Sequence, residues 1–177
     1  MAERAADEVL LDVSDILHAT ADSIHQDVDV SLGALAVGPT DFTPRGLVHV
    51  DVTLTNAGTA IVATGSVDAT LTTTCVRCLG ELDIPVHGEL EGFYVGHGTE
   101  HDLPDEQDYE FIEGATVDIM PAIRSALIVE LPFAPTHPAG CVAACPRCGE
   151  PQDECSCDRS SESPFSVLRD LFPEDRS

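Results

Sequence analysis

Apolar residues recur at every second position along four stretches in the first half of the chain, 27–36, 48–54, 61–71 and 82–94. Because successive side chains of a strand point to opposite faces, this period predicts half-buried strands. In the first stretch the predicted buried side holds Val28, Val30, Leu32, Ala34 and Ala36. Asn56-Ala57-Gly58 carries the residues of a short hairpin turn. The pattern predicts an antiparallel meander, or a partly closed barrel.

A helical period occurs after these strands, and it predicts one helix that covers a face of the sheet. Thr116 or Asp118 is the expected cap, and Pro121 falls in the first turn, where its missing N–H has no partner. The apolar stripe consists of Ile119, Ile123, Ala126 and Leu127, and Leu131-Pro132 ends the helix. The fold class is therefore α+β, mainly β.

Between the strands and the helix, seven of the fourteen residues 100–113 are acidic. This run predicts a solvated loop, with a short strand at 109–112. After Pro132 the composition shifts to Pro, Gly and Cys. We therefore expect a β-rich core over 1–131, a cysteine-rich tail over 132–158, and a linker with a short helix over 159–177.

Charge and composition narrow the function classes. The 177 residues include 32 acidic side chains and 8 basic ones, all arginine, for a net charge of −24. Such a chain repels phosphate at long range, which disfavours nucleic-acid binding driven by bulk charge. No apolar stretch is long enough for a membrane span, and the N-terminal residues predict no signal peptide. Seven cysteines without an export signal favour a reducing, cytoplasmic location.

The tail carries the strongest chemical signal. Cys-x-x-Cys followed by Gly is a turn that brings two thiolates to one Zn²⁺ ion, and Cys145, Cys148 and Gly149 have this form. Cys155 and Cys157 can complete the tetrahedron, and Cys141 is an additional ligand or a spare. We expect about one structural Zn²⁺ per chain, held mainly by Cys145, Cys148 and two of Cys141, Cys155 and Cys157. The alternative is a flexible tail with incidental thiols.

A second Cys-x-x-Cys, formed by Cys75 and Cys78 with Arg77 between them, falls at the turn between two predicted strands. It could be a redox pair, half of a zinc site shared with the tail, a partner contact, or two buried thiols. Redox catalysis favours a helix N-terminus, which a hairpin does not provide.

The sequence gives little support for an enzymatic function. His87-Gly88-Glu89 and Cys145-Pro-Arg-Cys148 resemble parts of a zinc deaminase motif, but Pro146 lies inside the cysteine pair rather than before it. The chain has no phosphate-binding glycine loop. We expect no enzyme activity, no catalytic residue and no small-molecule substrate.

The last segment predicts a short amphipathic helix. Ser163 is a suitable N-cap and Pro164 is suited to the first helical position. Phe165, Leu168, Leu171 and Phe172 would form one apolar stripe. So short a helix needs a surface to bury that stripe, either a partner, which we favour, or the chain's own β domain.

Three segments in this order resemble the YceD family, the large ribosomal RNA accumulation proteins. They are Cys75-Val-Arg77-Cys78-Leu, the stretch 117–132 leading to His137, and 163–171. The resemblance covers roughly residues 45–172. The tail is similar to that of the Gram-positive branch, except that His137 stands where a further cysteine is expected and can still ligate zinc. Other branches keep the hairpin cysteines without the tail cluster, which implies two separate sites.

The resemblance implies a non-enzymatic role in large-subunit ribosomal RNA accumulation or ribosome assembly. Its implied partners are a basic large-subunit ribosomal protein, ribosomal RNA, or both, in pre-ribosomal particles. A strongly acidic protein attracts a basic one by long-range steering, and Asp105, Glu106, Asp108 and Glu110 are candidate contacts. Arg77 is one of few candidates for an RNA contact. The alternative is a zinc-ribbon adaptor between proteins, unrelated to ribosomes.

Overall fold

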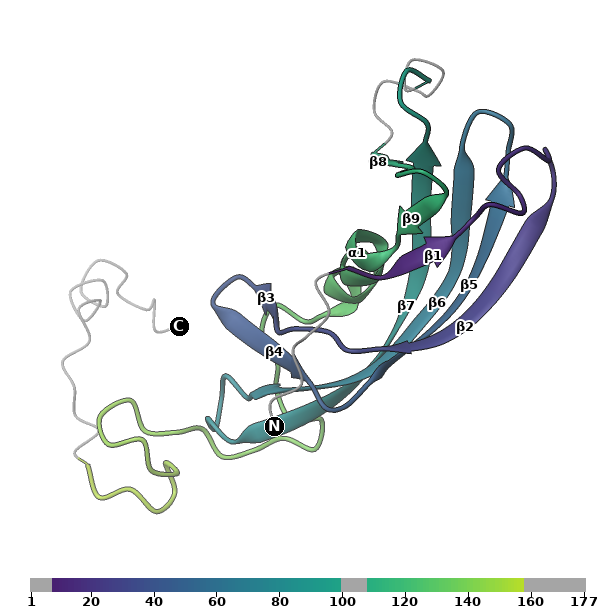
Figure 1. Ribbon diagram of the computed structural model, residues 1–177. Coiled ribbons are helices and arrows are strands. Elements are labelled where there is room, and N and C mark those ends of the chain that lie inside the picture. The colour runs from purple at the N-terminus through teal and green to yellow at the C-terminus, as the bar shows by residue number, and fades with distance from the viewer. Residues whose placement is uncertain (1–7, 100–107, 158–177) are drawn as a thin grey trace, which may run out of the picture.

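Nine strands and one helix make up the part of the chain that the computed structural model describes, residues 8–99 and 108–157 (Figure 1). The strands are β1 (Leu10–Asp12), β2 (Ser23–Val30), β3 (Leu35–Val37), β4 (Thr40–Pro44), β5 (Val48–Asn56), β6 (Ile61–Thr74), β7 (Glu81–Val95), β8 (Glu110–Phe111) and β9 (Thr116–Asp118). The helix is α1 (Met120–Glu130). The predicted mainly β class with one helix is confirmed.

The main sheet is antiparallel and open, in the order β2-β5-β6-β7. Because β6 and β7 are long, β4 also pairs with β6, beyond the end of β5. The valine and leucine side chains of β5 point to one face and are fully buried there. The sheet does not close, so the predicted meander is correct and the barrel alternative is wrong.

The first predicted strand is two strands with a change of phase between them. β2 ends at Val30, and the chain then turns into the β3–β4 hairpin. Leu35 is buried, whereas Ala34 and Ala36 are exposed, so the predicted alternation fails after Leu32. The cause is the change of direction, because a strand that leaves its sheet no longer keeps the period of the sheet.

The predicted turns connect these strands as expected. Asn56 Oδ1 accepts the N–H of Gly58 at 2.7 Å, and Gly58 has φ +94°, a conformation that glycine adopts without strain. Cys75 and Cys78 lie in the turn between β6 and β7. The short strand expected at 109–112 is β8, which pairs with the end of β7.

Helix α1 packs on the concave side of the curved sheet, together with the small β1–β9 pair (Figure 1). Its predicted stripe, Ile119, Ile123, Ala126 and Leu127, is buried. The N-cap position is Ile119, so the predicted cap Thr116 is wrong, and Asp118 lies one residue before the cap position, at the end of β9. The Asp118 carboxylate nevertheless accepts the N–H of Met120 at 3.0 Å and that of Val9 at 2.8 Å, which ties the helix start to the N-terminal segment.

Close packing between α1 and β7 depends on Gly88. A Cβ atom at this position would lie 2.5 Å from the carbonyl oxygen of Ala126.

No helix within the described ranges has the length and apolar character to cross a membrane.

Candidate metal centres

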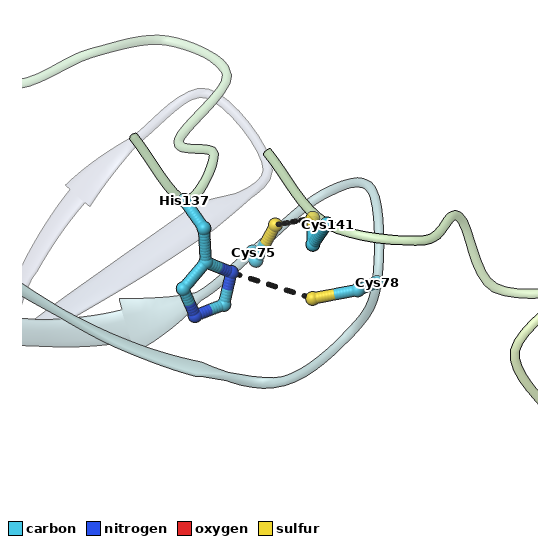
Figure 2. A group of neighbouring side chains, drawn as sticks. All are labelled: Cys75, Cys78, His137 and Cys141. Carbon is cyan, nitrogen blue, oxygen red and sulfur yellow. Dashed lines mark hydrogen bonds between the residues drawn. The ribbon is translucent and has the colours of Figure 1, made fainter. Parts of the chain in front are cut away.

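Four side chains from two distant parts of the sequence meet beside the β6–β7 turn (Figure 2). Cys75 and Cys78 come from the turn, and His137 and Cys141 come from the tail. Their ligand atoms all lie within 4.8 Å of one another. Cys75 is buried and the other three are partly buried. We call this set the hairpin centre.

The distances in the hairpin centre match those of a tetrahedral metal site. A Zn–S bond of about 2.3 Å places two thiolates of a tetrahedron about 3.8 Å apart. The Sγ atoms of Cys75 and Cys141 are 3.7 Å apart. The Cys78 Sγ atom lies 3.4 Å from His137 Nδ1, near the slightly shorter sulfur–nitrogen edge. The group therefore has the donor types and spacing to hold a metal ion.

The histidine ring is oriented by its second nitrogen. His137 Nε2 lies 3.1 Å from the carbonyl oxygen of Glu81, the first residue of β7. A carbonyl can only accept, so the Nε2 proton is donated to it and the lone pair of Nδ1 faces the sulfur atoms. Histidine ligands in metal proteins are commonly held by such a hydrogen bond.

The surroundings of the Cys75 sulfur favour its thiolate form. Backbone N–H groups of Cys78, Arg77 and His137 donate to it and lower its pKa to about 5, despite its burial. Burial and the neighbouring Cys78 and Cys75 thiols raise the pKa of Cys141 to about 11. The negative charge of the Cys75 thiolate disfavours deprotonation of Cys141 beside it. A divalent cation bound between the two sulfur atoms would relieve that repulsion.

Backbone hydrogen bonds dock the tail on the hairpin. The Val76 N–H donates to the carbonyl of Pro135 at 2.9 Å, and the Ala144 N–H donates to that of Arg77 at 2.7 Å. These two bonds fix the segment that carries His137 and Cys141. The centre thus links the tail to the end of the main sheet.

A second set of four ligands lies entirely within the tail. It consists of Cys145, Cys148, Cys155 and Cys157, whose sulfur atoms also lie within 4.8 Å of one another. The Cys148 and Cys155 sulfurs are 3.6 Å apart, again close to a tetrahedral edge. Cys145 is buried and Cys148 is exposed. We call this set the tail centre.

The two Cys-x-Arg-Cys turns have the same backbone geometry. The N–H of Leu79 donates to the carbonyl of Cys75 at 2.9 Å, and that of Gly149 donates to Cys145 at 2.8 Å. Backbone N–H groups of Arg147 and Cys148 donate to the Cys145 sulfur and lower its pKa to about 6, as the corresponding groups do for Cys75. Both turns therefore present a thiolate in the same way.

The turns differ at the residue after the second cysteine. Gly149 has φ +80°, and Leu79 has φ +60° in the same place. A leucine in this left-handed region is strained, and Leu79 is 60% exposed as a residue. The hairpin turn thus has the same left-handed backbone as the tail turn, although leucine disfavours that conformation.

The five predicted tail ligands are divided between the two centres. Cys141 lies with Cys75 and Cys78, and His137 completes that set. Cys145, Cys148, Cys155 and Cys157 form the other set. The spacing of the tail cysteines gave no sign of this division, because Cys141 is equally distant in sequence from His137 and Cys145.

Other predicted contacts lie partly or wholly outside the described residues. Asp108 and Glu110 are exposed, whereas Asp105 and Glu106 lie outside the described part of the chain. The predicted stripe of Phe165, Leu168, Leu171 and Phe172 also lies outside it. The side chain of Arg77 is exposed at the hairpin turn, where an external partner can reach it.

Comparison with known proteins adds a family. The family model described as "Large ribosomal RNA subunit accumulation protein YceD" matches residues 63–172, a range that includes most of β6, all of β7 and α1, and both candidate centres. The uncharacterized proteins Mb2951c of Mycobacterium bovis and Rv2926c of Mycobacterium tuberculosis are 26% identical over 135 residues, 73% of this chain and 61% of theirs. The uncharacterized protein ML1660 of Mycobacterium leprae is 26% identical over 107 residues, 58% of this chain and 48% of its own. The chain spans about three fifths of the length of the mycobacterial proteins it matches first. No solved structure matches significantly.

Proposed function

The chain belongs to the YceD family of large ribosomal RNA subunit accumulation proteins, and we propose that it promotes accumulation of that RNA in the cytoplasm as a non-enzymatic binding protein. The family match over β7, most of β6, the helix and the tail is the observation that carries the proposal. The sequence supports binding rather than catalysis, because its chemical motifs are cysteine turns suited to structural metal.

Depletion of the protein tests the role in ribosomal RNA. We expect the ratio of large-subunit to small-subunit ribosomal RNA to fall, and expression of the intact chain to restore it. An unchanged ratio would contradict the proposal and favour the alternative, a metal-containing adaptor between proteins unrelated to ribosomes.

We further propose that the hairpin and tail centres each hold one structural Zn²⁺. Sulfur and imidazole ligands in tetrahedral sets of four are typical of structural zinc, which leaves no open position for a substrate. The tail supplies few apolar side chains, so metal ligation would provide much of its stability. Two ions per chain replace the single ion that the sequence alone suggested.

Metal analysis of protein purified under reducing conditions tests this proposal. We expect about two zinc ions per chain, and about one in either Cys141→Ser or Cys157→Ser. The two variants are matched controls for each other, because each removes one thiol from a different centre. Zinc content near zero in the unaltered protein, or loss of both ions from either variant, would contradict two independent zinc sites.

The partner that we propose is a basic protein of the large subunit. The charge of −24 supports this choice over a direct RNA contact, since phosphates are repelled and lysine- or arginine-rich surfaces are attracted.

A further inference from the structure

The face of the main sheet that points away from its buried side chains is polar. No described helix or strand lies across it (Figure 1). Strand register places its side chains in rows that cross all four strands. One row is Asp29, His49, Asp68 and His87, and the next is Asp27, Asp51, Ser66 and Glu89. A third row ends at Glu91. We call these three rows the acidic face.

The acidic face has six carboxylates and neither lysine nor arginine. The carboxylates are Asp27, Asp29, Asp51, Asp68, Glu89 and Glu91. Strands β2, β5, β6 and β7 contain neither lysine nor arginine. Arg45 borders the face, and Asp83 holds it in an ion pair. The face therefore carries a concentrated negative charge that the described residues leave largely uncompensated.

Two like charges stand directly opposite each other within this face. Asp27 on β2 pairs in register with Asp51 on β5, an arrangement that destabilises an isolated sheet. The nearest donors are imidazoles: His49 Nδ1 lies 3.2 Å from Asp29 and 3.6 Å from Asp27, and His25 Nε2 lies 3.7 Å from Asp51. These side chains are roughly half exposed, so a stronger external donor can reach the same carboxylates.

From this geometry we infer that the acidic face is a docking surface for an extended, arginine- or lysine-rich protein segment. The inference rests on the proposed function, because it names the surface that binds the basic partner. Two residues along a strand span about 6.8 Å, so Asp27 and Asp29, or Glu89 and Glu91, match basic side chains at alternate positions of an extended segment. Guanidinium groups bind carboxylates through paired hydrogen bonds, which imidazoles do not offer.

The same face does not suit the other occupants. A second copy of the chain would place six carboxylates against six, and RNA would bring its phosphates to them. The exposed side chains in its rows are aspartate, glutamate, histidine, serine and threonine, so it lacks the apolar centre of a stable protein dimer. Charge complementarity thus favours a basic polypeptide.

Fluorescence anisotropy with the intact, metal-loaded protein tests the inference. The probe is a synthetic peptide with arginine at alternate positions, compared with a single-stranded RNA of equal length. Asp27→Asn, Asp51→Asn and Asp68→Asn are combined in one variant. The matched control combines Asp15→Asn, Asp22→Asn and Asp153→Asn. These three exposed carboxylates lie outside the three rows, and their substitution removes the same amount of negative charge.

We expect the acidic-face variant to bind the peptide about tenfold more weakly, since each exposed ion pair contributes a few-fold. The control variant should stay within about twofold of the unaltered protein. Equal losses in the two variants would overturn the inference, because bulk charge would then explain the binding. RNA that binds more tightly than the peptide would also overturn it.

The depleted cells separate this inference from the proposed function. If the unaltered chain restores the ribosomal RNA ratio and the acidic-face variant does so equally, the proposed function stands and the docking surface is wrong. If depletion leaves the ratio unchanged while the face-specific loss of peptide binding holds, the proposed function is wrong and the basic-segment surface stands.

Discussion

Gly88→Ala probes the contact that holds α1 on the sheet. The added Cβ would lie 2.5 Å from the Ala126 carbonyl oxygen and 2.8 Å from its carbon, both backbone atoms of the helix. Neither atom can rotate away, so the helix must move outward by somewhat less than 1 Å to restore ordinary contact. Inserting a methylene or methyl group into a closely packed site typically costs about 1–3 kcal/mol.

Thermal unfolding measured by circular dichroism gives this cost. For a chain of this size, 1 kcal/mol corresponds to about 2–4 °C, so we expect the melting temperature of Gly88→Ala to fall by roughly 3–10 °C. Gly96→Ala is the control, because a Cβ there meets only the Thr99 hydroxyl, at an ordinary 3.7 Å. Equal melting temperatures for the unaltered protein and Gly88→Ala would refute the close approach of α1 to β7.

Three further predictions concern charge, backbone and a buried amide. The hydrogen bond to Asp29 and the charge of Asp27 raise the pKa of His49. The hydrogen bond to Asp68 raises the pKa of His87, and the charges of Asp68, Glu89 and Glu130 raise it further. The stability that these two histidines contribute is therefore fully present below pH 6.5 and is lost as pH rises through their raised pKa values. The melting temperature of His49→Gln/His87→Gln should therefore approach that of the unaltered protein as pH rises above 6.5; a constant difference would contradict the raised pKa values. Gly149→Ala should weaken metal retention in the tail centre about 5- to 30-fold in chelator competition, because an alanine in the left-handed conformation costs about 1–2 kcal/mol. Leu79→Ala should leave metal retention in the hairpin centre nearly unchanged, because Leu79 already has a Cβ in that conformation. Asn56→Ala should cost about 1–3 kcal/mol in urea unfolding, since the buried Asn56 amide donates to the carbonyls of Ile16 and Leu17; a cost near zero would show that these bonds do not hold the 13–22 segment.

Side-chain periodicity predicted the parts of the fold in which a strand or helix has one solvent face and one buried face. Strands β5, β6 and β7 and the stripe of α1 follow from it. The period cannot report a change of direction, and so Ala34 and Ala36 were assigned to the wrong side. Asp118 has the chemistry of a helix cap, but pairing with β1 drew its residue into a strand.

The sequence predicted the kind of ligand in the candidate centres, but not which ligands belong to which of the two centres. Cysteine spacing identified both turns, since each is a local structure closed by its own backbone hydrogen bonds. The assignment of Cys141 depends on a long-range contact, the docking of Pro135 and Ala144 on the hairpin. No local pattern encodes that contact. The acidic face was missed for a similar reason, because its carboxylates are scattered in sequence and meet only through strand register.

The hairpin centre has a consequence for the order in which the protein is made. Cys75 and Cys78 are synthesised before all of β7 and α1, while His137 and Cys141 follow only after the helix has ended. A metal ion there joins early and late parts of the chain and can be fully ligated only once the residues of the helix have been synthesised. The four ligands of the tail centre span just residues 145–157, so that centre can close as soon as its own short segment exists. Full ligation of the hairpin centre therefore reports that the chain has been synthesised through Cys141, beyond the last strand and the helix.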